Sequence, residues 1–368
     1  MKTMVPLTLG VALLAGCAST QTAAPPPEFN PALDAASQVS SFIRPANTKT
    51  RGESRRVALT SCVVAFGTKT SGFAQTQAGT FAYQDPDKAR VEAKVSTLYQ
   101  LEGIGDAQMQ SMTDAICARA ERQLADAGLD VMPHAELAAT SAYQAVAAKG
   151  RQAPVDWSLG KSDYRVFVPT GWTLFDQRFD GKARGIKNIF AQASRSNPQA
   201  LEAKLVDELG VTGVHLDLMV DFANVSSSDE QYTGFIGRNV GRDEASLSTS
   251  VKLATSGVLK LVTPDVIHCH KLGCDTMWTA WPAYQSSRPL VSSDPFYTGM
   301  SDAQSAGSKV AEGLASAIGV LTALAGGTGG SYDRTEWAVE ADPTAYEDIA
   351  TRYAGYFVDM AVLAQQPN

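Results

Sequence analysis

The chain has 368 residues, of which 44% are hydrophobic and 19% charged, and its formal net charge at pH 7 is −7. This composition is typical of a globular protein and leaves room for one large domain or two ordinary ones. The acidic balance, without a long basic run, argues against a nucleic-acid partner, because binding phosphates requires clustered Lys and Arg.

The N-terminus, MKTMVPLTLGVALLAGCAST, predicts export. Lys2 precedes an apolar run over residues 5–15, which is shorter than the roughly 20 residues that span a bilayer. The run ends in Leu14-Ala15-Gly16-Cys17, which resembles the lipobox of bacterial lipoproteins. The resemblance implies that residues 1–16 are a signal peptide and that Cys17 receives diacylglycerol. An ordinary secretory signal in which Cys17 is incidental is the alternative.

The residues after Cys17 predict where the protein is held. In lipoproteins an Asp next to the lipidated cysteine favours the inner membrane, so Ala18 implies the outer membrane. The lipid dominates this attachment, since each buried methylene contributes about 0.8 kcal/mol. Residues 17–55 are poor in large apolar side chains and predict a flexible tether that reaches on the order of 35 Å. Residues 56–368 are expected to form a periplasmic domain without another membrane-spanning segment.

This domain is expected to begin with a β-α-β unit. Residues 57–66 form an apolar, β-branched run that is typical of a strand buried on both faces. After a long loop or hairpin, a helix is predicted from Asp106, with apolar side chains at three- and four-residue spacing and Gly128 beyond its end. Residues 129–132 are expected to form the second strand.

Helices are predicted next over 135–149 and after Asn197-Pro198, with a short strand at 165–168 between them. Residues 214–222 alternate between apolar and polar side chains, which is the clearest strand pattern in the chain. The segments 246–253 and 258–262 are predicted to pair as a hairpin across residues 255–257.

A strand at 336–340 and an amphipathic helix from Asp342-Pro343 complete the pattern. These elements predict an α/β (α+β) fold: a mixed sheet with a β-α-β start, an antiparallel meander, a closing C-terminal helix and long insertions. Residues 203–214, AKLVDELGVTGV, resemble the helix-to-strand step in the periplasmic α/β domain of curli-secretion-type lipoproteins. The resemblance implies the fold class alone, because a fold does not fix a function.

The stretch VIHCHKLGCD contains His268 and His270 together with Cys269 and Cys274. A His-x-His pair with a cysteine could begin a zinc site, but no second cluster follows to complete four ligands. In an oxidising compartment, four mature cysteines favour two disulfides. Cys269 and Cys274 could close a small loop, and Cys62 and Cys117 lie on a strand and a helix that must pack together. Disulfides are preferred, and free thiols and a metal site stay open.

Three further groups of side chains are candidates for function. His215, Asp217 and Asp221 share one strand face and could meet a cation or a substrate, although a solvated sheet face predicts the same alternation. Residues 301–332 are expected to form a small-residue apolar helix and a Gly-rich loop. The smooth ridge of that helix could serve self-association or pack in the core; it carries Ala311, Ala315, Gly319, Ala323 and Gly327. The third group is aromatic and could stack sugars or form core and rim; it comprises Trp157, Trp172, Trp278, Trp281 and Tyr284.

The sequence contains no Gly-x-Ser-x-Gly or His-Glu-x-x-His motif, and it predicts no catalytic residue and no cofactor. The expected function is therefore that of an outer-membrane lipoprotein acting as a non-enzymatic accessory or assembly component of the cell envelope, in a secretion or surface-structure system. Its expected partners are the membrane, through the lipid, and envelope proteins. A ligand-binding lipoprotein and an envelope hydrolase with a carboxylate site are the alternatives.

Overall fold

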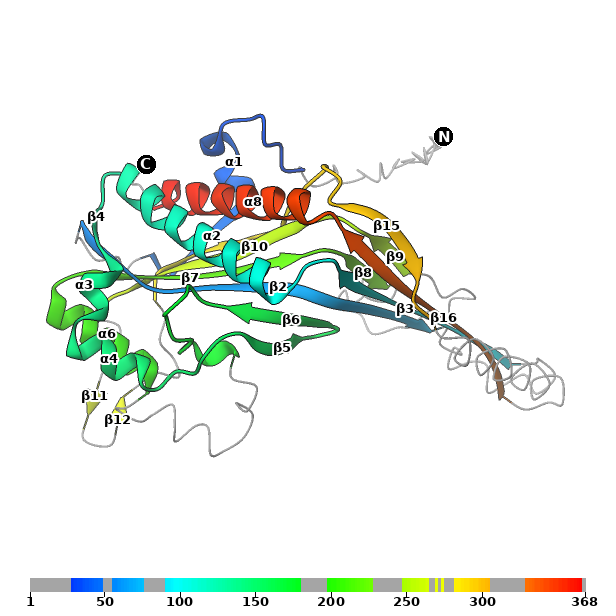
Figure 1. Ribbon diagram of the computed structural model, residues 1–368, viewed down its shortest axis with the longest axis horizontal. Coiled ribbons are helices and arrows are strands. Elements are labelled where there is room, and N and C mark those ends of the chain that lie inside the picture. The colour runs from blue at the N-terminus through cyan, green and yellow to red at the C-terminus, as the bar shows by residue number, and fades with distance from the viewer. Residues whose placement is uncertain are drawn as a thin grey trace, which may run out of the picture.

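The computed structural model describes residues 28–48, 55–75, 90–179, 197–227, 247–264, 269–270, 273–274, 281–304 and 328–365. Within these ranges the protein is built around a twelve-stranded mixed sheet, and two further strand pairs lie outside it. Helices cover both faces of the sheet (Figure 1). The predicted α/β fold, with a mixed sheet and a closing C-terminal helix, is confirmed.

Eight strands follow one another across the sheet, in the order β1 (Ile43–Ala46), β13 (Ala283–Ser286), β10 (Ala254–Val262), β7 (Thr212–Asp221), β2 (Arg56–Gln75), β3 (Arg90–Glu102), β16 (Thr328–Ala341) and β15 (Tyr297–Asp302). Four more pair beside them, namely β4 (Asp130–Met132), β5 (Val155–Leu159), β6 (Ser162–Phe167) and β14 (Leu290–Val291). Strands β7, β10 and β13 form the expected antiparallel run. Strand β2 pairs in parallel with both β4 and β7.

The helices occupy the two faces of the sheet unequally. Long helices α2 (Asp106–Asp126) and α8 (Pro343–Leu363) lie side by side on one face, next to α1 (Ala35–Phe42). The other face carries α3 (His134–Ala138), α4 (Ser141–Ala147), α6 (Pro198–Leu209) and the 3₁₀ turn η3 (Gln177–Phe179). The termini of α6 and α8 follow the predicted signals, since Asn197 and Asp342 cap them and Gly210 is left-handed, with φ 61°.

The largest hydrophobic core lies between the sheet and the pair α2 and α8, where Val64, Leu216 and Phe357 are buried. Two smaller cores lie on the other face. One packs under α4 and α6 and includes Phe175, and the other packs under β5 and β6 and includes Phe179. The residues that join these two smaller cores are charged, and they form the candidate site described below.

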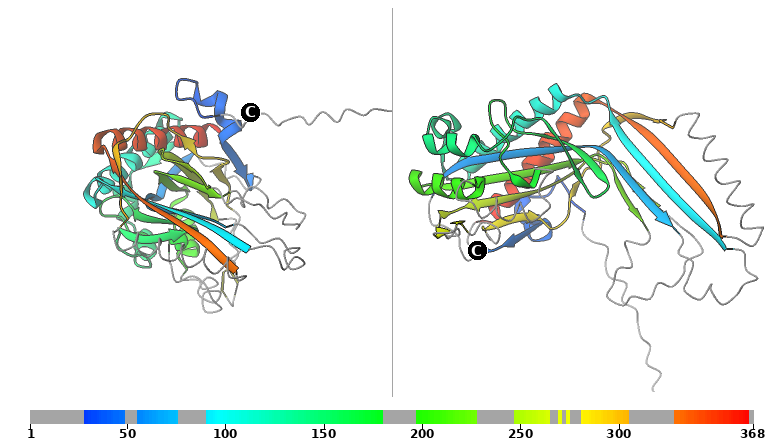
Figure 2. Two further views of the ribbon diagram at one scale, coloured as in Figure 1. Left: turned by 90° about the vertical axis from the view of Figure 1, so that its right-hand side faces the viewer. Right: turned by 90° about the horizontal axis from the view of Figure 1, so that it is seen from below.

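Strands β2, β3 and β16 run past the part of the sheet that α2 and α8 cover (Figures 1 and 2). We call the helix-covered part of the molecule the body. We call the outer part of β2 (residues 69–75), together with β3, β15 and β16, the ribbon. The sequence predicted a long loop or a hairpin after Gly67. The hairpin alternative is right, since β2 continues to Gln75 and pairs antiparallel with β3 over residues 69–75. These strands carry many Thr, Ser and Lys residues. They therefore lack the alternation of large apolar and polar side chains by which a strand is predicted from sequence.

The expected hairpin across residues 255–257 is wrong. All three residues lie inside β10, which pairs with β7 along its whole length, whereas β9 (Leu247–Ser250) pairs with β8 (Asn224–Ser227). Gly257, which suggested a turn, instead allows α8 and the neighbouring strand β7 to pack closely against β10. A Cβ at Gly257 would lie 2.8 Å from the ring of Phe357 and 2.7 Å from Leu218.

The tether predicted for residues 17–55 is not free over residues 28–48. There the chain forms α1 and β1, with Phe42 and Ile43 buried, and β1 pairs with β13. The ring of Phe29 lies 5.5 Å from that of Phe42 and 5.5 Å from that of Tyr353 on α8. A few large apolar residues thus bury enough surface to order this segment. The predicted domain boundary at residue 56 therefore falls too late.

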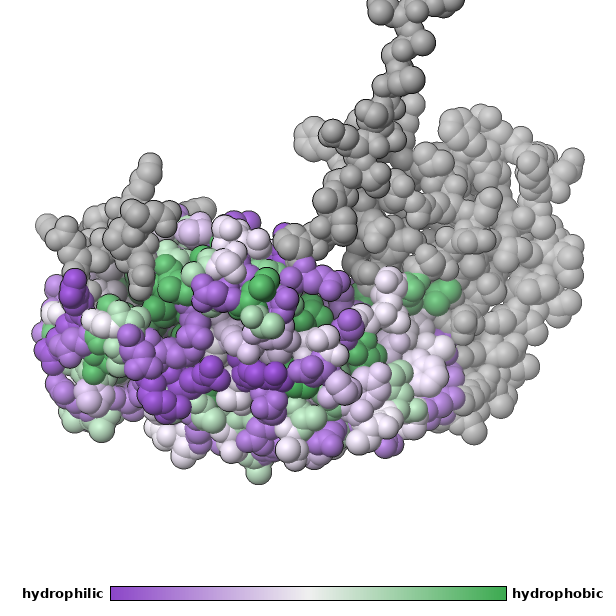
Figure 3. All heavy atoms as spheres, turned by 90° about the horizontal axis from the view of Figure 1, so that it is seen from above, coloured by the Kyte–Doolittle hydropathy of each residue, from purple (hydrophilic) through white to green (hydrophobic). Residues whose placement is uncertain are grey.

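The predicted helix and Gly-rich loop at residues 301–332 also need correction at both ends, because residues 301–302 belong to β15 and residues 328–332 to β16. Gly329 and Gly330 are strand residues that pair in parallel with β3. The small-residue ridge, including Ala315, Gly319 and Ala323, lies outside the described residues. None of the described helices is long and apolar enough to cross a bilayer. Hydrophilic side chains dominate the face seen from above, with separate small hydrophobic areas (Figure 3).

Candidate functional site

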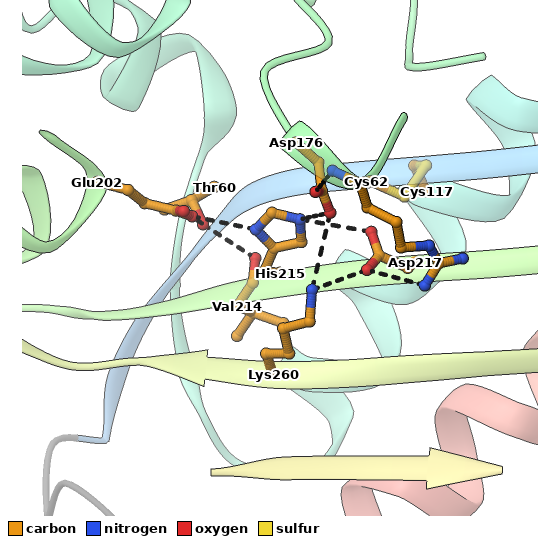
Figure 4. A network of polar contacts seen from close by, with 10 residues as sticks. Thr60, Cys62, Cys117, Asp176, Glu202, Val214, His215, Asp217 and Lys260 are labelled. Carbon is orange, nitrogen blue, oxygen red and sulfur yellow. Dashed lines mark hydrogen bonds and ion pairs between the residues drawn. A yellow bond between two sulfur atoms is a disulfide. The ribbon is translucent and has the colours of Figure 1, made fainter. Parts of the chain in front are cut away.

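A cluster of six charged or ionisable side chains is the most unusual feature of the described structure (Figure 4). His215 and Asp217 come from β7, Lys260 from β10, Asp176 and Arg178 from the segment around η3, and Glu202 from α6. Asp217 is 0% exposed, Glu202 1% and His215 4%. Charged groups are seldom buried unless they are paired, so each of these needs a compensating neighbour.

The strands position the centre of the cluster by register. Lys260 lies directly opposite His215, and Val258 lies opposite Asp217. Leu259 and Leu261 point into the core under α8, so Lys260 points to the opposite face, toward His215 and Asp217. The Lys260 ammonium donates to Oδ2 of Asp217 at 2.9 Å and lies 3.7 Å from Oδ2 of Asp176.

His215 lies between carboxylates on both sides of its ring. Its Nε2 is 3.1 Å from Oδ2 of Asp176 and 3.4 Å from Oδ1 of Asp217, while its Nδ1 is 3.4 Å from Oε1 of Glu202. The contact with Asp176 is a hydrogen bond, and the other two are ion-pair contacts without hydrogen-bond geometry. Three carboxylates around one imidazole favour the doubly protonated, charged ring. The ring edge of Phe175 packs against the imidazole, with centroids 6.0 Å apart.

A β-bulge brings the helix into the cluster. Leu59 pairs with Val214 and Ser61 with His215, so Thr60 is an extra residue in β2. The Thr60 hydroxyl lies 2.5 Å from Oε1 of Glu202, to which it donates. This contact fixes the Glu202 carboxylate at the histidine from the α6 side.

The electrostatics of the cluster follow from these contacts. Burial and Lys260 alone would lower the pKa of His215, but Asp217, Glu202 and Asp176 outweigh them and raise it well above its usual value. Burial would raise the pKa of Asp217, yet Lys260 and His215 hold it far below its ordinary value. Despite burial and Asp217, His215 and Lys260 also keep the pKa of Asp176 lowered. Three carboxyl groups thus meet three basic groups.

Donor atoms of Asp176, His215 and Asp217 lie within 4.8 Å of one another, which is a spacing that could hold a metal ion. However, the Lys260 ammonium already lies between the two carboxylates, and the guanidinium of Arg178 is 3.6 Å from Oδ2 of Asp217. These fixed cations neutralise the ligands that a divalent ion would need. The arrangement therefore fits an internal ion-pair network better than a metal centre.

No family model, curated protein or solved structure matches this chain.

The prediction for the polar face of β7 was only partly right. His215, Asp217 and Asp221 do share a face, but the expected solvated surface is wrong for the first two, which are buried. Asp221 lies farther along the strand, where it accepts a hydrogen bond from the Tyr164 hydroxyl at 2.8 Å. Sequence reasoning missed Asp176, Arg178, Glu202 and Lys260. Of these only Lys260 carried a signal, as the single charge within the apolar run of β10.

The cysteine predictions have two outcomes. The structure contains a disulfide between Cys62 on β2 and Cys117 on α2, with Cα atoms 6.1 Å apart, which is the pair expected from the strand and helix that must pack. Strands β11 (Cys269–His270) and β12 (Gly273–Cys274) pair antiparallel with Cys269 opposite Cys274. This backbone pairing suits the expected clip, but a bond between the two cysteines stays a prediction. Cys17 and His268 lie outside the described residues.

The described tryptophans have structural surroundings. Trp281 and Tyr284 are buried. Trp172 stacks on His134, with centroids 3.6 Å apart, and Trp157 packs against Phe179 at 4.9 Å. These contacts fit the interpretation of core and rim. Trp278 lies outside the described residues.

Proposed function

We propose that this protein is an outer-membrane-anchored lipoprotein that acts as a non-enzymatic accessory or assembly component of the cell envelope, in a secretion or surface-structure system. The observation that carries the proposal is the ribbon, whose strands extend beyond the part of the sheet that the described helices cover (Figure 2). Within the described residues β15 pairs with β16 alone, and a strand with one unpaired edge is suited to pairing with another protein.

Two exposed apolar side chains support a contact role for the ribbon. Phe73 on β2 is 41% exposed and Met300 on β15 is 38% exposed. Strand β15 ends the sheet order on the ribbon side. Met300 lies on this edge strand, where its side chain and a backbone edge that is unpaired among the described strands can both meet a partner, and Phe73, three strands away on β2, adds aromatic contact area.

The charged cluster supports a structural use rather than a catalytic one. A general acid or base must reach the proton that it transfers in the substrate. Here the imidazole and the Asp217 carboxylate are buried, and their polar atoms already face one another. The cluster therefore holds the η3 segment and α6 to the sheet. This role fits a body that serves as a rigid support for the ribbon.

The lipid anchor is tested with Cys17→Ala and with globomycin, which blocks lipoprotein signal cleavage. We expect both to prevent maturation and to move the protein out of the outer-membrane fraction. Unchanged maturation and fractionation would contradict an anchor at Cys17.

The contact role is tested by photo-crosslinking in intact cells. A photoreactive phenylalanine replaces Phe73 on the ribbon, and the matched control replaces Leu159, which is 49% exposed at the end of β5. We expect crosslinks to specific envelope proteins, or to further copies of this chain, from position 73 and not from position 159. Equal patterns from both positions, or none from position 73, would contradict the proposal.

A further inference from the structure

A hollow of about 480 Å³ lies where the ribbon joins the body, on the same sheet face as the charged cluster. Its wall combines the turn between β5 and β6, the ends of β7 and β9, and the strands β8, β10 and β14. This volume is in the range of small-molecule sites in proteins. The hollow plays no part in the proposed contact role of the ribbon.

The side chain of Asp221 sets the chemistry of this hollow. It is a largely buried carboxyl group, and burial raises its pKa. It accepts a hydrogen bond from the hydroxyl of Tyr164, which also lines the hollow. Asp176 and Asp217 each face a lysine, whereas no ion pair involves Asp221 among the residues that the structure describes. A buried carboxylate without a cation favours a positively charged ligand group.

The remaining wall carries two cations and an apolar part, and Lys161, in the turn between β5 and β6, is one of the two cations. Lys252 is exposed and lines the hollow, two residues before Ala254, which pairs opposite Asp221 in the sheet. Val225, Pro289 and Val291 add apolar surface. One carboxylate, two ammonium groups and an apolar wall are thus brought together around one small space.

We propose that this hollow binds a small zwitterion of the amino-acid or short-peptide class, with the ligand ammonium at Asp221, its carboxylate at Lys252 and its apolar side chain on Val225 and Val291. Each charged group of the ligand meets an opposite charge, and the Tyr164 hydroxyl holds Asp221 in place. The signal sequence predicts a periplasmic location, where the hollow would meet amino acids and short peptides.

The proposal is tested by calorimetric titration of the full-length protein, purified in detergent, with the dipeptide Ala-Leu. N-acetyl-Ala-Leu lacks the ammonium, and Ala-Leu amide lacks the carboxylate. We expect Ala-Leu to bind, N-acetylation to weaken binding at least about tenfold, and amidation to weaken it to a similar or lesser degree. Blocked and free dipeptides binding equally, or no binding of Ala-Leu at millimolar concentration, would overturn the proposal.

Variants locate the site. Asp221→Asn and Lys252→Met are expected to reduce affinity for Ala-Leu, whereas Lys204→Met, on the exposed face of α6, leaves it unchanged. Unchanged affinity in Asp221→Asn would overturn the assignment. Thermal unfolding of each unliganded variant checks folding, and the comparison of blocked and free dipeptides decides the matter if Asp221→Asn does not fold.

Discussion

The ammonium of Lys260 lies 2.9 Å from Oδ2 of Asp217, a carboxylate whose side chain has no exposed surface. The two residues belong to neighbouring antiparallel strands and meet diagonally across the sheet. A buried carboxylate is stable only when an opposite charge compensates it, and Lys260 supplies that charge to Asp217.

Breaking this pair from one side should be costly. We expect Lys260→Met to lower the free energy of unfolding by about 3–5 kcal/mol, because Asp217 and Asp176 would keep their charges without the ammonium. Urea unfolding followed by tryptophan fluorescence measures the loss. The double variant Lys260→Met/Asp217→Asn keeps acidic and basic groups equal in number, so it should lose clearly less than the sum of the two single losses. Additive losses would show that the two residues are not coupled.

The raised pKa of His215 sets the pH dependence of stability on the alkaline side. The ring titrates near pH 6.5 in the unfolded chain, and the folded protein binds this proton more tightly. Its stabilising contribution is therefore complete below about pH 6.5 and is lost as the pH rises through the folded value. We expect the free energy of unfolding to fall as the pH rises above about 6.5, and His215→Gln to flatten this slope. An unchanged slope in the variant would assign it to another group.

His134 should behave in the opposite way. Burial lowers the pKa of this ring to about 4, where it stacks on Trp172. Between pH 6.5 and 4 the unfolded chain binds a proton that the folded protein does not, so stability falls as the pH falls. An NMR titration should show the His134 ring titrating near pH 4. A midpoint near 6.5 would contradict the buried stack.

Gly257 is expected to tolerate no side chain. A Cβ there would meet the backbone oxygen of Asp217 and the ring of Phe357 at 2.8 Å, so Gly257→Ala should cost about 1–3 kcal/mol through overpacking. Gly299→Ala on β15 is the matched control, because its Cβ would meet nothing closer than 3.8 Å. Thermal unfolding of the two variants should separate them, and equal midpoints would contradict the packing of α8 on β10.

The Cys62–Cys117 bridge closes a loop over a sequence separation of 55 residues. Loop-closure entropy gives such a bridge about 4 kcal/mol. We expect the double variant Cys62→Ala/Cys117→Ala to unfold at a clearly lower urea concentration than the parent protein. The predicted bridge between Cys269 and Cys274 would close a loop of only a few residues, so the double variant Cys269→Ala/Cys274→Ala should lose less. Mass spectrometry of the unreduced protein tests the second bridge directly.

Local signals predicted much of the fold because the elements concerned are determined locally. Asn197-Pro198, Gly210 and Asp342-Pro343 mark the ends of α6 and α8 through capping and fixed backbone angles. The inner part of β2 was visible because apolar residues face both of its sides. The outer part of β2 pairs with β3, and β3 pairs along its whole length with β16. These strands depend on distant partners, and their many polar residues give no local signal that separates them from a loop.

The candidate site was predicted only in part, for a physical reason. Alternation along β7 shows that its two faces differ, but it cannot show whether the polar face meets water or other polar groups. The groups that bury His215 come from distant segments: Asp176 precedes it by 39 residues, and Lys260 follows it by 45. Their meeting depends on sheet register and on the bulge at Thr60, which the sequence does not display.

The docking of Phe29 beside α1 and α8 has a consequence for the geometry of the envelope. Phe29 lies only twelve positions after Cys17, and a chain of that length spans at most about 40 Å when fully extended. With a lipid on Cys17, the face that bears α1 and the part of α8 in contact with Phe29 would be kept toward the membrane. The anchor would then act as a short hinge that limits orientation as well as distance, so the direction in which the ribbon points would be restricted too.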